Sequence, residues 1–349
     1  MHKNPLASSL WRAMALAGIA LLLTACATTA HETIASAPVQ VWPEAPAEAR
    51  ITYVQAFARP EDLGIHKGFF QRLAEVFVGS SDARTIRPMA VVTTADDVLF
   101  VADPGARGVH RFDRARGRYR LIRCDDDAPL LSPVGLAVGR AGEVYVADSA
   151  LAGIWVIARD ADFATPLGLK DTLKQPTAVA FDPVNNRLLV VDTGAHQVKQ
   201  FAPDGALLSS FGQRGNGDGE FNFPTAIWRD AGGLLYVTDS LNFRIQIFDA
   251  QGKFVARFGR HGDATGDLSR PKGVATDHFG HVYVVDSLFH ALQVFDRNGT
   301  FLLNIGSQGQ APGEFWLPTG LFVSDNDTIY VADSHNQRVQ VLRYIGSTP

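Results

Sequence analysis

The segment LLYVTDSLNFRIQIFD, from Leu234 to Asp249, contains two runs of alternating apolar residues separated by a short polar stretch. Alternation with a period of two is typical of β-strands, because successive side chains of a strand point to opposite faces of a sheet. Asp239 ends the first run. An acid at the end of a strand can be a catalytic base, a metal ligand or a turn residue, and the rest of the sequence must decide among these alternatives.

Six copies of the motif Val-x-Asp recur in the chain at intervals of 44 to 47 residues. Its aspartates are Asp103, Asp148, Asp192, Asp239, Asp286 and Asp333. A proline lies 15 or 16 residues before each aspartate, and alanine or glycine follows two residues after each proline. Self-similarity at a fixed period of this length is the signature of a repeat architecture.

Each copy of the repeat predicts four short strands. In the fifth copy these are GVATD, HVYVVD, ALQVFD and TFLLNIG, within residues 273–306, and an Asn-Gly turn separates the last two. Four strands per repeat and six repeats predict an all-β fold, a six-bladed β-propeller. The small residue after each proline allows the six innermost strands to approach the axis.

Closure of the ring requires a strand from elsewhere, because the last copy ends after its third strand, RVQVLRY. The segment ITYVQAF, Ile51–Phe57, precedes the first copy and has the right length and alternation. We expect it to complete the last blade, so that no sheet edge stays open. The predicted propeller therefore spans residues 51–345, with an amphipathic helical insertion at about 66–78 that either caps the ring or docks a partner.

The N-terminus predicts export. A basic start precedes the 13-residue apolar stretch AMALAGIALLLTA, which is too short to span a bilayer as a helix. The following LTAC resembles the lipobox of bacterial lipoproteins; the alternative is an ordinary secretory signal. The resemblance implies a signal peptide over 1–25, a lipid on Cys26, and, with Ala27 next, sorting to the periplasmic face of the outer membrane. Residues 26–50, rich in Ala, Pro, Thr and Glu, are expected to form a flexible tether.

The fourth and sixth copies resemble the NHL repeat, whose pattern is a Gly-rich loop, Gly-x-Phe, Pro, strands and Asp-Ser-x-Asn-x-Arg. The fourth copy contains GEFNFP and DSLNFR, and the sixth contains GEFWLP and DSHNQR. The fifth copy lacks the Asn and Arg, and the first three match more weakly. The resemblance covers about residues 50–345. It implies an interaction domain: some NHL domains bind protein, some in animals bind RNA, and a related propeller is a metal-dependent lyase acting on peptidyl-hydroxyglycine.

The repeat makes a structural role the preferred interpretation of Asp239 and its five equivalents. A single active site would need such a residue once, whereas this one occurs in every copy. A carboxylate at the end of the second strand can accept N–H bonds from the following turn. Asp239 can also pair with Arg244, and Asp333 with Arg338, five residues further on.

A candidate binding face lies where the loops between blades meet the turns between the second and third strands. Its proposed residues are basic or aromatic: Arg87, Arg107, His196, Phe243, Arg270, Lys272, His290 and His335. On a chain with a net charge of −4, this face favours an acidic or peptidic ligand; the alternative is a solvated rim with scattered charge. The three histidines lie in outer turns, where convergence on a metal is not expected, so no metal, cofactor or catalytic residue is assigned, and Zn or Ca is only a minor alternative.

Two classes of function remain. The first is a lipid-anchored, non-enzymatic binding or scaffold platform for a protein or peptide of the cell envelope. The second is a propeller enzyme of the metal-dependent lyase or lactonase type. The innermost strands contain mostly Ala, Gly, Thr and Val, which favours binding over catalysis. Net negative charge and an exported location argue against nucleic acid as a partner.

Overall fold

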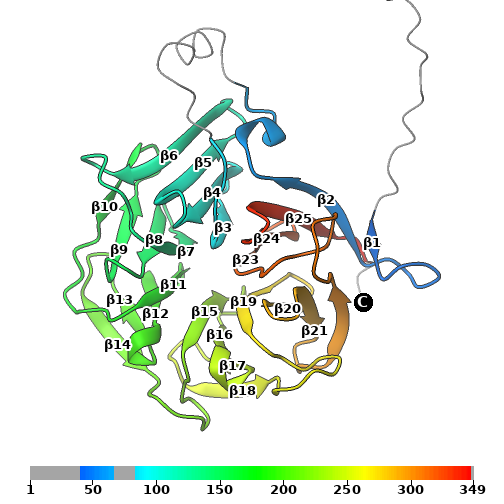
Figure 1. Cartoon of the computed structure of the whole chain (residues 1–349). Helices are drawn as coiled ribbons and strands as arrows, with labels where there is room; N and C mark the ends of the chain where they lie inside the picture. The colour runs from blue at the N-terminus through cyan, green and yellow to red at the C-terminus, as the bar shows by residue number, and fades with distance from the viewer. Residues whose placement is uncertain (1–39, 67–82, 347–349) are drawn as a thin grey trace, which may run out of the picture. The chain divides into compact units, whose positions relative to one another are not determined.

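The strands form six four-stranded antiparallel blades arranged in a ring, as predicted (Figure 1). The computed structural model describes residues 40–66 and 83–346. Blade 1 consists of β3 (Ala90–Thr93), β4 (Val98–Asp103), β5 (Gly108–Asp113) and β6 (Arg118–Cys124). Blade 2 consists of β7 (Pro133–Val138), β8 (Val144–Asp148), β9 (Gly153–Ile157) and β10 (Phe163–Pro166). Blade 3 consists of β11 (Pro176–Asp182), β12 (Arg187–Asp192), β13 (Gln197–Phe201) and β14 (Leu207–Phe211).

The next two blades have the same order of strands, and those of blade 5 match the strands expected from the sequence to within two residues. Blade 4 consists of β15 (Pro224–Arg229), β16 (Leu235–Asp239), β17 (Arg244–Phe248) and β18 (Phe254–Phe258). Blade 5 consists of β19 (Pro271–Thr276), β20 (Val282–Asp286), β21 (Ala291–Phe295) and β22 (Phe301–Ile305). Three short 3₁₀-helices complete the described elements: η1 (Pro60–Leu63), η2 (Thr193–Ala195) and η3 (Ser240–Asn242).

Blade 6 joins the two ends of the described chain. It contains β23 (Leu321–Val323), β24 (Thr328–Asp333), β25 (Arg338–Tyr344) and β2 (Ile51–Phe57). β2 pairs antiparallel with β25, from Ile51 opposite Tyr344 to Phe57 opposite Val339, so the predicted closure by the N-terminal strand is confirmed.

A fifth strand extends blade 6. β1 (Val41–Trp42) pairs with the outer edge of β2. The Trp42 side chain is only 8% exposed and packs in one cluster with Ile305 and Phe315. The boundary expected between tether and propeller at residue 51 is therefore too late, because the folded part already includes these residues of the expected tether. The signal peptide, Cys26 and all but one residue of the expected helix at 66–78 lie outside the described residues.

The core lies between neighbouring blades, where both faces of the second strand of each blade are buried. In blade 4, every residue of β16 is buried, and Val237 packs with Val191 and Val198 of blade 3. The innermost strands approach as closely as the repeat predicts. A Cβ atom on Gly320 would lie 2.8 Å from Ala90 Cα, and one on Gly135 would lie 2.8 Å from the Thr177 carbonyl oxygen. Main-chain atoms cannot yield at such distances, so these positions accept only glycine without a shift of the backbone.

Blades 1 and 2 are also joined at their outer edge. β6 and β10 pair in parallel through two residue pairs, Arg123 with Phe163 and Cys124 with Ala164. The two blades thereby form a single eight-stranded sheet. Among the residues that the structure describes, no helix is long and apolar enough to cross a membrane.

Candidate functional site

The six repeated aspartates hold the loops on one side of the ring. Each is fully buried at the end of the second strand of its blade. Asp286 illustrates the geometry: its carboxylate accepts N–H bonds from Ser269 and Arg270 before the first strand, and from Leu288 and Phe289 in the following turn. The aspartate thus ties the entry into the innermost strand to the turn between the second and third strands, which is more than the local turn expected from the sequence.

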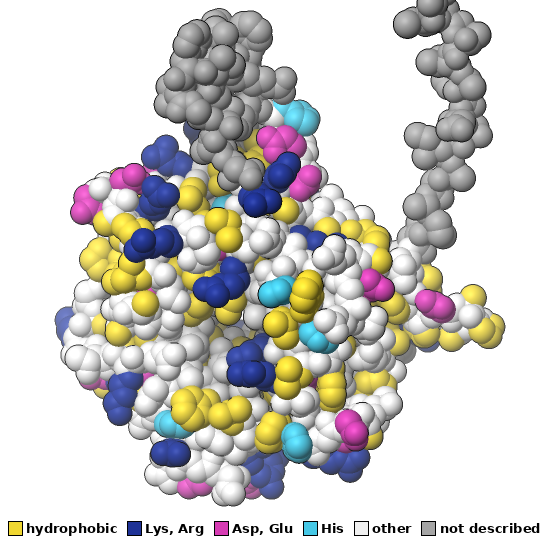
Figure 2. Space-filling model, viewed as in Figure 1, with side chains coloured by type: hydrophobic (Ala, Val, Ile, Leu, Met, Phe, Trp, Pro, Cys, Tyr) yellow, Lys and Arg dark blue, Asp and Glu magenta, His cyan; other side chains and the backbone are white. Residues whose placement is uncertain are grey.

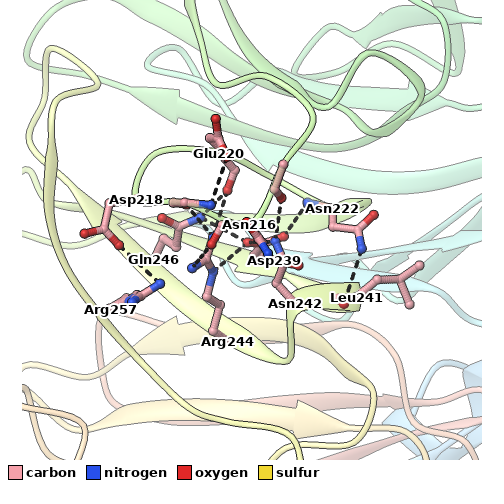
Figure 3. Close-up of polar contacts among 12 residues, drawn as sticks. Asn216, Asp218, Glu220, Asn222, Asp239, Leu241, Asn242, Arg244, Gln246 and Arg257 are labelled. Atoms are coloured by element: carbon pink, nitrogen blue, oxygen red, sulfur yellow. Dashed lines mark hydrogen bonds and ion pairs between the residues drawn. The ribbon is translucent and has the colours of Figure 1, made fainter.

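In blade 4 the Asp239 carboxylate is the centre of a larger network (Figure 3). It accepts hydrogen bonds from Asn222 N–H, Asn242 Nδ2, Arg244 Nε and Gln246 Nε2, at 2.7 to 3.0 Å. The Arg244 guanidinium then donates to the carbonyl oxygens of residues 216, 217 and 220 in the Gly-rich loop. Blade 6 repeats this arrangement with Asp333, Asn336, Arg338 and Gln340.

The glutamine of this network was not singled out from the sequence, although the repeat carried the signal. A glutamine stands seven residues after the aspartate in three copies, as Gln246, Gln293 and Gln340. In the first copy His110 takes this place, and its Nε2 lies 3.2 Å from Asp103 Oδ2. Burial acts against the ionised form of Asp103, but the bonds from His110 and from the backbone outweigh it and lower the pKa of the carboxyl.

The predicted basic residues Arg87 and Arg270 occupy equivalent places, each just before the proline that begins the innermost strand. Their backbone N–H groups donate to Asp103 and Asp286, which fixes the main chain, and both side chains are exposed. Four further predicted residues share another position, four residues after the aspartate, where φ is positive. These are Arg107, His196, Phe243 and His290, with φ from 53° to 56°.

The three candidate histidines do not converge. His196 Nδ1 accepts the N–H of Phe223, at 3.2 Å, and His290 Nδ1 accepts the N–H of Leu317, at 3.0 Å. Each of these bonds links one blade to the loop that enters the next. His335 instead packs against Trp316, with ring centroids 4.1 Å apart. In residues 40–66 and 83–346, no group of three or more His, Cys, Asp or Glu side chains is placed to hold a metal ion.

The loops around the axis carry cations and apolar groups but no acid. We call this surface the axial face: the two residues before and the one after each repeated proline, with the four residues after each repeated aspartate. It contains five cations, Arg87, Arg107, Lys174, Arg270 and Lys272. Seven large apolar side chains on it are exposed, Ile86, Leu131, Leu151, Phe223, Leu241, Leu288 and Leu317. In Figure 2 dark blue and yellow side chains surround the centre of the ring, and magenta ones lie mostly toward its periphery.

A cavity of about 580 Å³ opens at the centre of the axial face, and the innermost strands of all six blades line it. Threonine hydroxyl groups line its opening. The Thr177 hydroxyl reaches the carbonyl oxygen of Thr225, and the Thr225 hydroxyl reaches that of Lys272, both at 3.4 Å. Deeper, the lining is apolar, with Leu136, Trp228 and Phe322 among its members.

Lys272 brings the only lysine ammonium into the lining of this cavity. The side chain is half-buried, and within the described part of the chain no hydrogen-bond or ion-pair partner meets its Nζ. Burial, and to a smaller degree the nearby charge of Arg270, lowers the pKa of Lys272. Lys272 was predicted from the sequence as part of the binding face, whereas Lys174, the exposed apolar residues of the axial face and Trp228 were not.

Comparison with known proteins supports the architecture. A family model described as a 6-bladed beta-propeller matches residues 268–344. The fold is a six-bladed β-propeller. A search among curated proteins found no match.

Solved structures with a similar fold include propellers with different roles. A streptogramin B lyase is 14% identical, with 77% of this chain and 82% of that chain covered and a TM-score of 0.56. Virginiamycin B lyase from Staphylococcus aureus is 14% identical, with 74% and 96% covered and a TM-score of 0.55. An auxiliary nutrient binding protein from Bacteroides thetaiotaomicron is 11% identical, with 75% and 70% covered and a TM-score of 0.59. At such identities these similarities concern the propeller fold alone.

Proposed function

We propose that this propeller is a non-enzymatic binding platform of the cell envelope, anchored by a lipid on Cys26, and that its axial face binds an acidic, partly apolar segment of a protein or peptide. The observation that carries the proposal is the composition of that face: five cations and seven exposed apolar side chains, with no Asp or Glu. Complementary charge supplies selectivity and speeds the encounter, and apolar contacts supply affinity.

The distribution of charge supports this choice, because the whole chain is negative, with a net charge of −4. The acids that do lie beneath the axial face are the six repeated aspartates, and their carboxylates are buried and hydrogen-bonded. They therefore do not present charge to a partner. A solvated rim with scattered charge would not be expected to exclude acids from all six blades.

An enzyme of the lyase or lactonase type is the alternative. Such an enzyme needs acidic, histidine or amide side chains on the innermost strands around the axis. The charged members of the cavity lining are Lys272, Arg229 and Asp325. Arg229 Nε lies 2.9 Å from Asp182, and its Nη1 donates to the carbonyl oxygen of residue 230, so this guanidinium is already engaged. This donor set suits ligand binding better than general acid–base or metal-assisted chemistry.

Site-directed photocrosslinking in intact cells tests the proposed face. A photoreactive amino acid at Leu241 or Leu288, both exposed on the axial face, is expected to capture one discrete partner. The matched control is Val184, which is 74% exposed in the turn between β11 and β12 on the opposite side of the ring. Adducts of the same mass from all three positions would show that contact is not specific to the axial face.

Charge reversal completes the test. Arg87→Glu with Arg270→Glu is expected to reduce the adduct from Leu241 by roughly tenfold, because like charges would then face an acidic partner. The control pair, Lys253→Glu with Arg297→Glu, changes the net charge equally in exposed turns on the opposite side. Equal losses from both pairs, or loss from neither, would contradict the proposal.

A further inference from the structure

The central cavity extends below the axial face and shares Lys272 with it. Its wall is apolar along most of its depth, and at one end lies the cation of Lys272, which has no ion-pair partner among the described residues. The volume of about 580 Å³ falls within the range of small-molecule sites, which are mostly apolar with a few polar groups that set orientation.

The charged groups are arranged asymmetrically along the axis. Lys272 is the second residue of β19, at the axial-face end. Asp325 follows β23, and Arg229 ends β15, so both lie at the far end of the innermost strands. Since Arg229 is engaged with Asp182, the described residues that line the far end offer an anion no free cation. An anionic group entering the cavity would therefore be stabilised at Lys272 and disfavoured near Asp325.

The wall between these ends can cover an apolar chain. An innermost strand of six residues such as β19 is roughly 17 Å long at about 3.3 Å per residue. Leu136, Val274 and Phe322 contribute apolar surface along this length. The indole Nε1 of Trp228 donates to Thr276 Oγ1 at 2.9 Å, and its ring meets Phe322 edge to face, at 5.8 Å. The Trp228 ring is thus fixed by its contacts on the wall of the cavity.

We propose that the central cavity binds a medium-chain aliphatic carboxylate, with its carboxylate at Lys272 and its hydrocarbon chain directed toward Trp228 and Phe322. With C–C bonds of about 1.5 Å, an extended chain of ten carbons spans roughly 12 Å and fits the length of the wall. The carboxylate supplies the ion pair that Nζ lacks, and the threonine hydroxyls at the mouth remain neutral neighbours. This inference concerns the interior of the cavity and does not depend on the proposed binding at the axial face.

Tryptophan fluorescence measures binding directly, because Trp228 lines the cavity. The chain from residue 27 onward keeps every described strand and omits Cys26, the proposed site of the lipid. Titration with hexanoate, octanoate and decanoate is expected to change the emission, with affinity rising about 15-fold for each pair of CH₂ groups buried. Trp228→Phe is expected to abolish the change in emission while decanoate binding, followed by calorimetry, persists.

The role of the charge is tested with ligand and protein variants together. Decan-1-ol, which lacks the carboxylate, is expected to bind the unmodified protein about 10- to 100-fold more weakly than decanoate. Lys272→Met should remove this difference by weakening decanoate alone, and Lys272→Gln serves if the first variant does not fold. The matched control is Lys253→Met, which changes an exposed lysine in the turn between β17 and β18, outside the cavity lining, and should leave the difference intact.

Three results would overturn the inference. The first is the absence of both an emission change and binding heat with decanoate. The second is equal affinity for decanoate and decan-1-ol in the unmodified protein. The third is the same decanoate affinity in Lys272→Met and the unmodified protein. Because none of these measurements involves the macromolecular partner, failure here and failure of photocrosslinking on the axial face are separately visible.

Discussion

Asp239 and Asp286 have the same structural role in the repeat but different hydrogen-bond partners. Both carboxylates are fully buried at the end of the second strand. Asp239 is bound by one backbone N–H and by three side chains, of which Arg244 carries charge. Asp286 is bound by backbone N–H groups from both neighbouring loops. The residue Ala291 takes the place of the arginine in the fifth copy.

Replacement of these two aspartates by asparagine should therefore have unequal effects on stability. Asp239→Asn leaves the buried Arg244 guanidinium without its counter-charge, and we expect the free energy of unfolding to fall by about 2–3 kcal/mol. Asp286→Asn keeps an acceptor oxygen and leaves no buried cation without a counter-charge. The decrease in its free energy of unfolding should therefore be smaller. Urea unfolding of both variants measures the difference, and equal losses would contradict the role assigned to the ion pair.

The identity of these aspartates as structural residues could be inferred from the sequence, because the repeat displays the same residue six times, 15 or 16 residues after a proline. That no side chain in the described part of the protein pairs with Lys272 could not be inferred in this way. It depends on which side chains from the other five blades reach the axis, and a repeat period contains no information about those contacts. For the same reason, the bonds from the loops to His196 and His290 could not be foreseen.

At the scale of the elements, the alternation of apolar residues predicts β2 but not β1. β2 has seven residues with clear alternation, and its pairing with β25 follows from the absence of a fourth strand in the last copy. β1 has two residues in a stretch rich in Ala and Pro. Two residues are too few to show a period, so it is the pairing of β1 with β2 and the packing of Trp42 that reveal this stretch to be folded.

Three N-terminal truncations separate the contributions of these strands to thermal stability. Deletion of residues 27–39 removes no described strand and should leave the melting temperature unchanged. Deletion of residues 27–48 removes Trp42 from a cluster with Ile305 and Phe315, and it should lower stability by about 3 kcal/mol, the scale of a buried aromatic side chain.

Deletion of residues 27–58 should have the largest effect, because it also removes β2 and exposes the edge and apolar face of β25. Melting temperatures followed by circular dichroism should therefore fall in that order. Equal values for the second and third truncations would mean that β2 does not close the ring in solution.

At the scale of the whole molecule, the proposed lipid on Cys26 would confine the propeller to a membrane surface. The expected chemistry is specific, because only a cysteine in the lipobox-like sequence LTAC can be diacylated. Cys26→Ser should abolish incorporation of a radioactive fatty acid and leave the exported precursor uncleaved. Cys124→Ser, which changes the other cysteine of the chain, is the matched control and should keep both the fatty-acid labelling and the cleavage of the precursor. Labelling that survives in Cys26→Ser would show that the lipobox interpretation is wrong.

The parallel pairing of β6 with β10 has a consequence for how this protein meets other copies of itself. An unpaired outer strand can recruit a strand from another molecule, which is a common route to aggregation. In blades 1 and 2 the outer strands β6 and β10 pair with each other, so they are less available to a strand from another molecule. Among the described strands, β14, β18 and β22 lack an outer neighbour and carry the exposed side chains Leu207, Leu208, Val255 and Leu302. Self-association by strand addition should therefore begin on the half of the ring formed by blades 3 to 5.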